Sequence, residues 1–143
     1  MRAVFPIAAM LATAAQAAAT QPADVRAVAR SYLQAQQDVM QAGAGPAQVE
    51  ALLGFYTPDF VYAHPAVGAR IVGAQPHRDG LTAQLGLTRD AHIEIRDMLV
   101  SGNVVAVAAI EHFTTVADGH VETRQRMYVL TIRGGRIAQR VDI

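Results

Sequence analysis

The first pattern along the chain is helical. From Gln21 to Ala42, apolar residues recur every three or four positions, which predicts an amphipathic helix. Gly43 and Gly45 stop this helix, and Pro46 to Leu53 predicts a second, short one with its proline in the first turn. A third helix is expected from about Gln75 to Leu85. Each predicted helix has one apolar face to bury.

Alternating apolar and polar residues predict strands elsewhere. Phe60 to His64 is expected as a short strand after a turn at Thr57-Pro58-Asp59. Gly68 to Val72 is expected as a second short strand or a loop. Ala91 to Val100 alternates and predicts the first long strand. A Ser-Gly-Asn turn then leads into a C-terminal meander.

Two turn signals divide this meander, which runs from Val104 to Ile143, into three strands. Asp118-Gly119 is typical of a two-residue type I′ hairpin, in which both central residues have positive φ. Gly134-Gly135 offers a second turn of this kind. A two-residue first turn places Glu111 opposite Arg126, and opposite charges favour that register. The two turns also predict the cross-strand pairs Ala109–Tyr128, Val107–Leu130 and Ile132–Ile137.

The register sorts the meander onto two faces of a sheet. The face with the larger apolar side chains is expected to look inward, and it comprises Val105, Val107, Ala109, Glu111, Phe113, Arg124, Arg126, Tyr128, Leu130, Ile132, Ile137, Gln139 and Val141. The other face comprises Val104, Ala106, Ala108, Ile110, His112, Gln125, Met127, Val129, Thr131, Arg140 and Asp142. Neither face is fully polar, so we expect helices on one side and a partner subunit on the other. A slip of one residue would exchange the two faces.

This order of elements is typical of an α+β domain with helices on one face of a curved sheet. The 143 residues suffice for one core, and no repeat or linker indicates a second domain. The formal net charge is zero, and no basic run indicates nucleic-acid binding. The absence of cysteine and lysine excludes disulfides, thiolate chemistry and Schiff bases. No histidine pair has the helical spacing of a zinc site, so we expect no metal.

The first 20 residues differ from the rest of the chain. Met1-Arg2 is a short positive start, Ala3 to Ala15 is apolar, and Ala15-Gln16-Ala17 fits a small-x-small cleavage site. This pattern predicts a signal peptide over residues 1–20 and one domain over residues 21–143 that works in the periplasm or outside the cell. The apolar run is too short for a transmembrane helix, so no membrane association is expected after cleavage. An alanine-rich tail is the alternative interpretation.

Four segments together resemble a known superfamily. They are Val28–Leu33, Phe55–Pro65, Gly73 and Gly135–Ile137. In this order they resemble the nuclear transport factor 2-like superfamily, and more narrowly its SnoaL-like and ketosteroid isomerase-like branch. The resemblance covers Asp24 to Ile143 and implies a cone-shaped, curved antiparallel sheet packed on three N-terminal helices. The superfamily includes isomerases, cyclases, dehydratases and epoxide hydrolases, so the fold alone leaves the activity open.

The resemblance also implies positions for a proton-transfer site. In the isomerase branch, a tyrosine on the first helix and an acid on a late strand donate hydrogen bonds to an oxyanion, while a carboxylate before a proline abstracts the proton. The tyrosine matches Tyr32, the base position matches His64 before Pro65, and the late-strand donor falls near Tyr128. Two of these three positions carry other residue types than the branch does. This departure argues against a ketosteroid isomerase and leaves a related proton transfer open.

Each candidate residue also has a structural interpretation. His64 suits general base catalysis at neutral pH, or it is a strand-end histidine bonded to the local backbone. Tyr32 and Tyr128 are either hydrogen-bond donors to substrate or core tyrosines with a bonded hydroxyl. Glu111 and Arg126 form either a buried ion pair at a cavity or an ordinary cross-strand salt bridge.

The remaining charged residues are expected outside the site. His112 faces away from the inner face, where an interface role is favoured over catalysis. Arg140 and Asp142 end the chain on the outward face, where they can pair, and we assign them no chemistry. The other histidines lie in helix-start or loop contexts and are expected to be solvated: His77, His92 and His120.

Two hypotheses follow. The first is an exported enzyme that transfers a proton on a small hydrophobic molecule without a cofactor. Its catalytic group would be His64, Tyr32, Tyr128, Glu111 and Arg126, and its substrate-binding side chains Tyr56, Phe60, Tyr62, Phe113 and Leu130. The second is a non-catalytic ligand-binding or assembly module. On either hypothesis a homodimer is expected, because the outward sheet face carries the apolar residues Ile110, Met127 and Val129.

Overall fold

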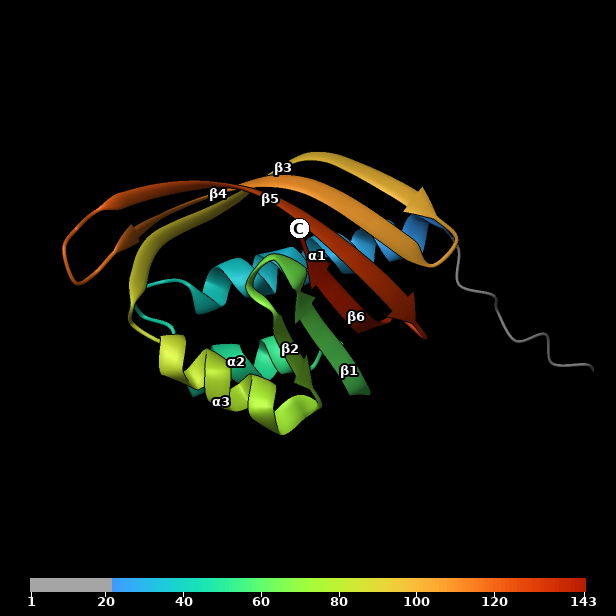
Figure 1. The fold of residues 1–143 in the computed structure, drawn as a ribbon, viewed down its shortest axis with the longest axis horizontal. Helices are drawn as coiled ribbons and strands as arrows, with labels where there is room; N and C mark the ends of the chain where they lie inside the picture. Colours follow the sequence, from blue (N-terminus) through green and yellow to red (C-terminus); the bar gives the residue numbers. More distant parts are fainter. Residues whose placement is uncertain (1–21) are drawn as a thin grey trace, which may run out of the picture.

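A computed structural model describes residues 22–143 of the chain. The predicted signal peptide and Gln21 lie outside these residues. Figure 1 shows the order of the elements, which are α1 (Pro22–Val39), α2 (Pro46–Leu53), β1 (Tyr56–His64), η1 (Pro65–Val67), β2 (Ala69–Val72), α3 (Ala74–Gln84), β3 (Thr88–Ser101), β4 (Val104–Thr115), β5 (Val121–Arg133) and β6 (Arg136–Asp142). This order confirms the predicted α+β arrangement. None of the described helices is both long and apolar enough to span a bilayer.

The three helices form close to where the sequence predicts them. Helix α2 has the predicted bounds, and at its start the Gly45 N–H donates to the Gln48 side chain over 2.9 Å. Helix α1 ends at Val39 rather than Ala42, because hydrogen-bonded turns replace the helix from Met40 onward. Helix α1 packs on β3 and β4, α2 lies between α1 and α3, and α3 packs beside β1 and β2.

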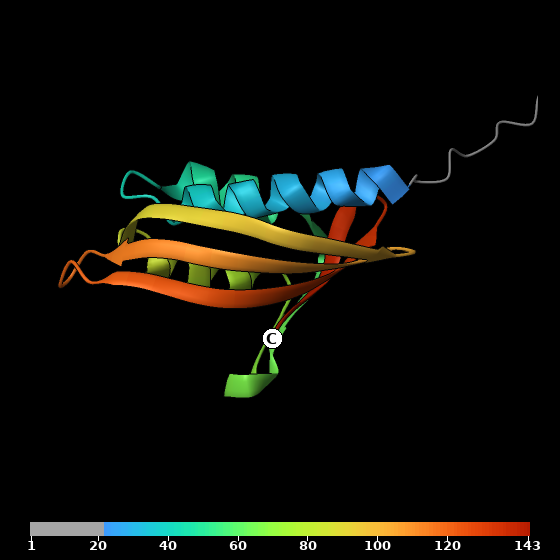
Figure 2. The same cartoon turned by 90° about the horizontal axis from the view of Figure 1, so that it is seen from above.

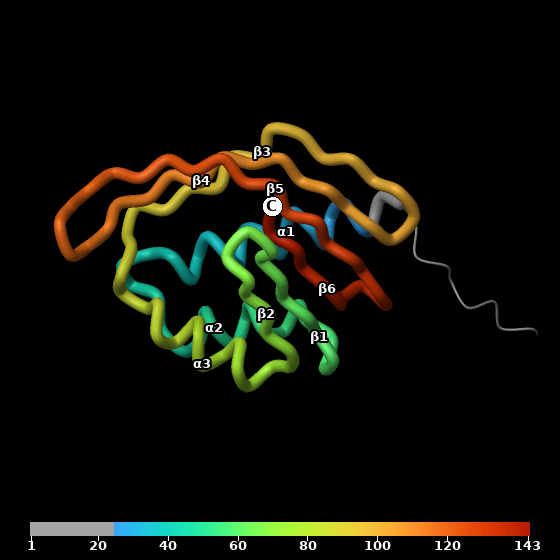
Figure 3. Tube along the Cα trace, viewed as in Figure 1, coloured from blue at the N-terminus to red at the C-terminus, as the bar shows by residue number. Residues whose placement is uncertain are grey.

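The six strands form one curved sheet in the order β2-β1-β6-β5-β4-β3. The strands β3 to β6 are antiparallel, as predicted, but β1 pairs with β6 in parallel, so the sheet is mixed. In Figure 2, α1 runs along the edge of the sheet that β3 forms, and the trace in Figure 3 shows β4 and β5 arching over the helices. The curvature brings β1 and β6 around to face the inner side of β4 and β5.

The β4–β5 hairpin corrects the predicted register. Thr115 pairs its N–H with the carbonyl of His120 over 2.9 Å, so the loop between them has four residues instead of two. The Asp118 carboxylate holds this loop by accepting hydrogen bonds from the Thr115 hydroxyl and the His120 N–H. Glu111 therefore lies opposite Arg124 rather than Arg126. The shift is even, so every side chain of β4 and β5 stays on its predicted face. The pairs Val107–Leu130 and Ala109–Tyr128 are replaced by Val105–Leu130 and Val107–Tyr128.

A β-bulge in β6 overturns the prediction for the end of the chain. The Gly134-Gly135 turn and the Ile132–Ile137 pair form as predicted, but Thr131 then pairs with Gln139, which leaves Ala138 as an extra residue. One extra residue reverses the faces of everything that follows. Arg140 and Asp142 therefore lie buried on the inner face, and the predicted inner residues Gln139 and Val141 lie on the other one.

Strand β1 also begins earlier than predicted. Thr57-Pro58-Asp59, expected as a turn, belongs to the strand. Its pairing with β6 is interrupted between Tyr56 and Val61, and this irregular stretch accommodates Pro58, which has no N–H for a ladder.

The core lies between the inner sheet face and the helices. Its largest fully buried side chains come from α1, α2, β1, β5 and β6: Tyr32, Leu33, Leu52, Phe60, Tyr128, Leu130 and Ile137. The outer face stays open in the monomer, where Leu99 is 67% exposed and Met127 44%. The prediction that β4 and β5 turn their larger apolar residues inward is confirmed.

Candidate functional site

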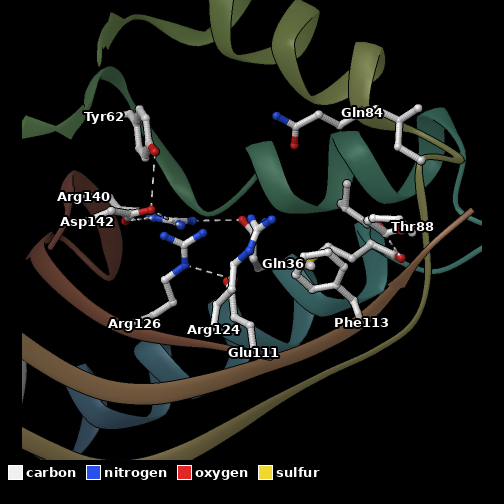
Figure 4. A pocket seen from close by; sticks show the side chains of 14 residues that line it. Gln36, Tyr62, Gln84, Thr88, Glu111, Phe113, Arg124, Arg126, Arg140 and Asp142 are labelled. Carbon is white, nitrogen blue, oxygen red and sulfur yellow. Dashed lines mark hydrogen bonds and ion pairs between the residues drawn. The ribbon is translucent and has the colours of Figure 1, made fainter. Parts of the chain in front are cut away.

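A cavity of about 370 Å³ opens beside the inner face of the sheet (Figure 4). Its lining comes from every element except α2, η1 and β2, and from the residues next to them: Gln36, Val39, Met40, Tyr62, Gln84, Leu87, Thr88, Glu111, Phe113, Thr115, Arg124, Arg126, Arg140 and Asp142. Five of these residues are charged, so the cavity is more polar than the small apolar pocket expected from the sequence.

Arg140 and Asp142 form a buried ion pair at the floor of this cavity. Their residues are only 7% and 4% exposed. The Arg140 Nε donates to Asp142 Oδ1 over 2.6 Å and Nη2 donates to Oδ2 over 2.7 Å. This two-pronged geometry is the strongest form of an arginine–carboxylate contact. It occupies both carboxylate oxygens of Asp142.

The rest of the Arg140 guanidinium is held by α1 and by aromatic rings. Nη1 donates to the Tyr32 hydroxyl over 2.7 Å and to Gln36 Oε1 over 3.0 Å. The guanidinium carbon lies 4.7 Å from the centre of the Tyr128 ring and 5.5 Å from that of Tyr62, within the range of a cation–π contact. A buried charge is tolerated only with such partners.

A line of hydrogen bonds leads from Arg140 into the protein interior. The Tyr32 and Tyr56 hydroxyls lie 3.1 Å apart, and the Tyr56 hydroxyl lies 3.1 Å from His77 Nε2. Burial first, and the Tyr32 hydroxyl second, raise the pKa of Tyr56 well above its ordinary value. Burial, together with the positive charge of Arg140, lowers the pKa of His77 to about 4, so this histidine is neutral at pH 7. The prediction that His77 is solvated is wrong, because α3 turns its side chain inward.

Glu111 provides the second buried carboxylate, and its residue is 6% exposed. It accepts a hydrogen bond from the Tyr128 hydroxyl and another, over 3.1 Å, from Arg126 Nε. Burial, followed by the neighbouring Glu111 charge, raises the pKa of Tyr128 above its ordinary value, so the phenol keeps its proton. Of the two interpretations of Glu111 and Arg126, the structure has the inner-face pair at a cavity, with the two residues diagonal rather than directly opposite.

The rim of the cavity combines aromatic and cationic groups. The Tyr62 hydroxyl donates to Asp142 Oδ2 over 3.4 Å, and burial, then the charge of Asp142, raises the pKa of Tyr62. Arg124 places its guanidinium carbon 4.9 Å from the centre of the Phe113 ring. The side of the cavity near Tyr62 and Asp142 is therefore suited to a polar group of a ligand, and the Phe113 ring to an apolar one.

The structure brings four of the five predicted catalytic residues together. Glu111 and Arg126 line the cavity, whereas Tyr128 and Tyr32 lie one hydrogen bond behind it, on Glu111 and Arg140. His64 is not among the lining residues. It is half-buried at the end of β1, and its Nδ1 has no hydrogen-bond partner among the described residues.

The predicted substrate-binding side chains divide in the same way. Tyr62 and Phe113 line the cavity. The other three are buried in the core and do not reach it: Tyr56, Phe60 and Leu130. Sequence reasoning missed Gln36, Arg124, Arg140 and Asp142 as site residues. The signal for Arg140 and Asp142 was two opposite charges at i and i+2 on one strand. Across residues 22–143, no three side chains of metal-binding type come together.

Comparison with known proteins begins with family models. The model of the SnoaL-like domain matches residues 37–140, which include nearly all of the cavity lining. No curated protein sequence matches the chain as a relative.

Solved structures with the same fold are numerous but distant in sequence. A hypothetical protein with a ketosteroid isomerase-like fold from Catenulispora acidiphila, in complex with trimethylamine, has a TM-score of 0.62 and 18% identity over 78% of this chain and 83% of its own. An LEH-like epoxide hydrolase from M. tuberculosis has a TM-score of 0.63 and 16% identity over 81% of both chains. TerC, co-crystallised with polyporic acid, has a TM-score of 0.64 and 19% identity over 84% and 90%. At these identities the likeness establishes the fold.

Proposed function

The chain belongs to the SnoaL-like domain family, and from this premise we propose that it is an enzyme that transfers a proton on a small, largely hydrophobic molecule without a cofactor. The proposal rests on Glu111, a buried carboxylate on the cavity wall with one phenol and one guanidinium as fixed partners. A carboxylate positioned beside a partly apolar cavity is suited to general base and acid catalysis. Isomerisation, cyclisation and dehydration each include such a step.

Glu111 would take the proton. The C–H bond of the substrate breaks, the proton moves to a Glu111 oxygen, and the electron pair moves onto a carbonyl oxygen of the substrate. Arg126 stabilises the carboxylate before the transfer, and Tyr128 orients it. The same carboxyl group then returns the proton to another atom of the substrate, so the cycle needs no external acid.

The developing oxygen anion needs donors that are already in place. Tyr62 is suited to this role because it lines the cavity and keeps its proton, its pKa being raised by burial. Its single O–H would turn to the substrate from Asp142, to which it makes a long hydrogen bond of 3.4 Å and which Arg140 already satisfies. Gln36 lines another wall of the cavity. Arg140 and Asp142 already satisfy each other, so we assign them the positioning of Tyr32, Gln36 and Tyr62. His64 remains a prediction from the sequence resemblance alone.

Deuterium exchange tests this role without knowledge of the complete reaction. The full chain is incubated in D₂O with a panel of small cyclic ketones, and exchange at the carbon next to the carbonyl is followed by proton NMR. Removing a general base lowers such a rate by about 10²–10⁴-fold. We expect Glu111→Gln to abolish the enzyme-dependent exchange, since glutamine keeps the shape of the side chain but accepts no proton.

The matched control is Glu94→Gln. Glu94 is a glutamate on the neighbouring strand β3 that does not line the cavity and pairs with Arg96 instead. This variant should exchange the probe as the original chain does. If Glu111→Gln exchanges deuterium as fast as the Glu94→Gln control and the original chain do, Glu111 is not the general base.

A second candidate function is ligand binding without catalysis. It is favoured by the completeness of the polar network, because both oxygens of Asp142 and both oxygens of Glu111 have donors before any substrate arrives. A protein of this kind would bind ketone probes in the cavity and exchange no proton. The same NMR samples separate the two functions, because binding broadens the probe signals while exchange removes them.

We also propose export and homodimer formation, as expected from the sequence. Export is supported by the composition of residues 1–20 alone. Dimer formation through the outer sheet face is supported by the exposure of Leu99 and Met127 there. Native mass spectrometry of protein recovered from a bacterial periplasm gives both the mass after cleavage and the number of subunits. A full-length mass or a monomer would contradict the respective proposal.

A further inference from the structure

We propose that this cavity selects molecules that carry a carboxylate, and that Arg126 and Arg124 bind it. The inference rests on the proposed function of the same cavity and names the class of its substrate. It follows from the charges that line the cavity, from the donors that remain unused, and from the apolar surface beside them.

The cavity holds more positive than negative charge. Three arginines and two carboxylates line it: Arg124, Arg126, Arg140, Glu111 and Asp142. The lining therefore carries one net positive charge when all five groups are ionised. In a partly enclosed cavity an excess charge is poorly screened and favours a ligand of the opposite sign.

Arg140 is not the group that supplies this charge to a ligand. Its Nε and Nη2 are used by Asp142, and its Nη1 is used by Tyr32 and Gln36. Its charge is neutralised at close range by a carboxylate whose oxygens are both occupied. The excess charge must come from elsewhere on the wall.

Arg126 has a free face. Its Nε donates to Glu111, but among the described residues neither Nη atom has a hydrogen-bond acceptor. Its side chain is 24% exposed, so these donors can be reached. In Figure 4 the guanidinium extends into the cavity toward Arg140 and Asp142. Two parallel N–H groups on a planar guanidinium match the two oxygens of a carboxylate.

Arg124 adds a second cation on the same face of the same strand. It lies two positions before Arg126 in β5, and both line the cavity. Its protein contacts are a cation–π contact with Phe113 and an ion pair with Glu122, whose Oε2 lies 3.4 Å from Nε. Glu122 does not line the cavity. Its Nη atoms have no acceptor among the described residues. The two side chains therefore present four unused NH₂ groups to one region of the cavity.

The apolar part of the lining indicates the rest of the ligand. Phe113, Leu87, Met40 and Val39 line the cavity along with the arginines. A flat hydrophobic body can pack on this surface while its carboxylate meets the guanidinium groups. The structure thus favours a hydrophobic monocarboxylate over a neutral molecule of the same shape.

Two probes of equal shape test this preference. The full chain is titrated with 2-naphthoate and with 2-naphthamide by isothermal titration calorimetry at low ionic strength. We expect the carboxylate to bind about tenfold more tightly than the amide, the effect of one charge-assisted hydrogen-bonded pair. Salt should weaken the binding of naphthoate and leave that of naphthamide unchanged.

Variants then locate the preference. Arg124→Gln and Arg126→Gln should each lower naphthoate affinity by about tenfold and leave naphthamide affinity unchanged. Arg136→Gln is the control, because it removes the same charge at the exposed β5–β6 turn, away from the cavity. Arg126→Gln could fail to fold because Glu111 loses its partner. In that case the affinities of Arg124→Gln and of the original chain for the two probes still test whether the cavity prefers a carboxylate.

Several results would overturn the inference. They are equal affinity for the two probes, a preference that survives in both cavity variants, an equal loss in Arg136→Gln, or no naphthoate binding up to about 10 mM, a very weak affinity by protein standards. The proposed function fails separately. If Glu111→Gln leaves proton exchange unchanged while naphthoate is still preferred, the catalytic role is wrong and the carboxylate site stands.

Discussion

Replacing Arg140 with methionine isolates the contribution of the buried ion pair. The variant keeps an unbranched side chain in place of the arginine stem but leaves Asp142, at 4% exposure, without its two strong donors. It also removes the donor that Tyr32 and Gln36 share. Removing one partner of a buried pair costs about 3–5 kcal/mol, because the remaining charge has no water to replace the lost contact.

The free energy of unfolding of a domain is only about 5–15 kcal/mol, so this loss is a large part of the whole. For a domain of this size it corresponds to a fall in Tm of about 10–20 °C. The double variant Arg140→Met with Asp142→Leu removes the charge that the single variant strands. We therefore expect it to be more stable than Arg140→Met alone, since an apolar pair of similar volume often replaces an ion pair at little cost.

Urea unfolding followed by circular dichroism at pH 7 measures these differences, provided that the slope with urea concentration stays constant. The control is Arg78→Met, which breaks the exposed pair with Glu50 and should leave the midpoint unchanged. If Arg140→Met shifts the midpoint no more than Arg78→Met does, or if the double variant is less stable than the single one, the buried pair does not hold the fold as argued.

Two further predictions concern pH and the bulge. Because burial lowers the pKa of His77 to about 4, the unfolded chain binds a proton that the folded chain does not between about pH 6.5 and 4. Acidification across this window should therefore lower the free energy of unfolding of the original chain by about 3 kcal/mol. The exposed-site control His120→Gln should lose the same amount, and His77→Gln should not. The prediction is wrong if stability depends on pH equally in all three proteins. Deleting Ala138 should abolish cooperative thermal unfolding, because it returns Arg140 and Asp142 to the outer face. Deleting Val116 from the β4–β5 loop is the control and should leave unfolding cooperative. Cooperative unfolding of the Ala138 deletion would refute this account of the bulge.

The helices and the inner face of β4 and β5 were predictable because both depend on local periodicity. In β4, Val105, Val107 and Ala109 alternate with residues that are only half-buried, and this period of two is visible in the sequence itself. The apolar side chains of α1 recur with the helical period in the same way. A periodic pattern of this kind shows which face of a strand or helix is apolar, and that face is the one the fold buries.

Turn length is harder to predict than turn position. Asp118-Gly119 marks the hairpin, and Gly119 does adopt positive φ, yet the side chain of Asp118 closes a longer loop through Thr115 and His120. The resulting error of two residues moved Glu111 from Arg126 to Arg124. This error left the predicted site residues on the inner face, because an even shift keeps each side chain on its face. Arg126 still bonds to Glu111, from the diagonal position.

An odd shift has the opposite effect, and β6 contains one. Local hydrophobicity favours Gln139 and Val141 over Arg140 and Asp142 as inner residues, and by that criterion the prediction was reasonable. The chain instead buries the charged pair, because α1 and β1, far away in the sequence, supply Tyr32, Gln36 and Tyr62 as hydrogen-bonding partners. Burial of a charge depends on such distant partners, which a local pattern does not contain. The floor of the cavity is therefore a part of the site that only the three-dimensional structure reveals.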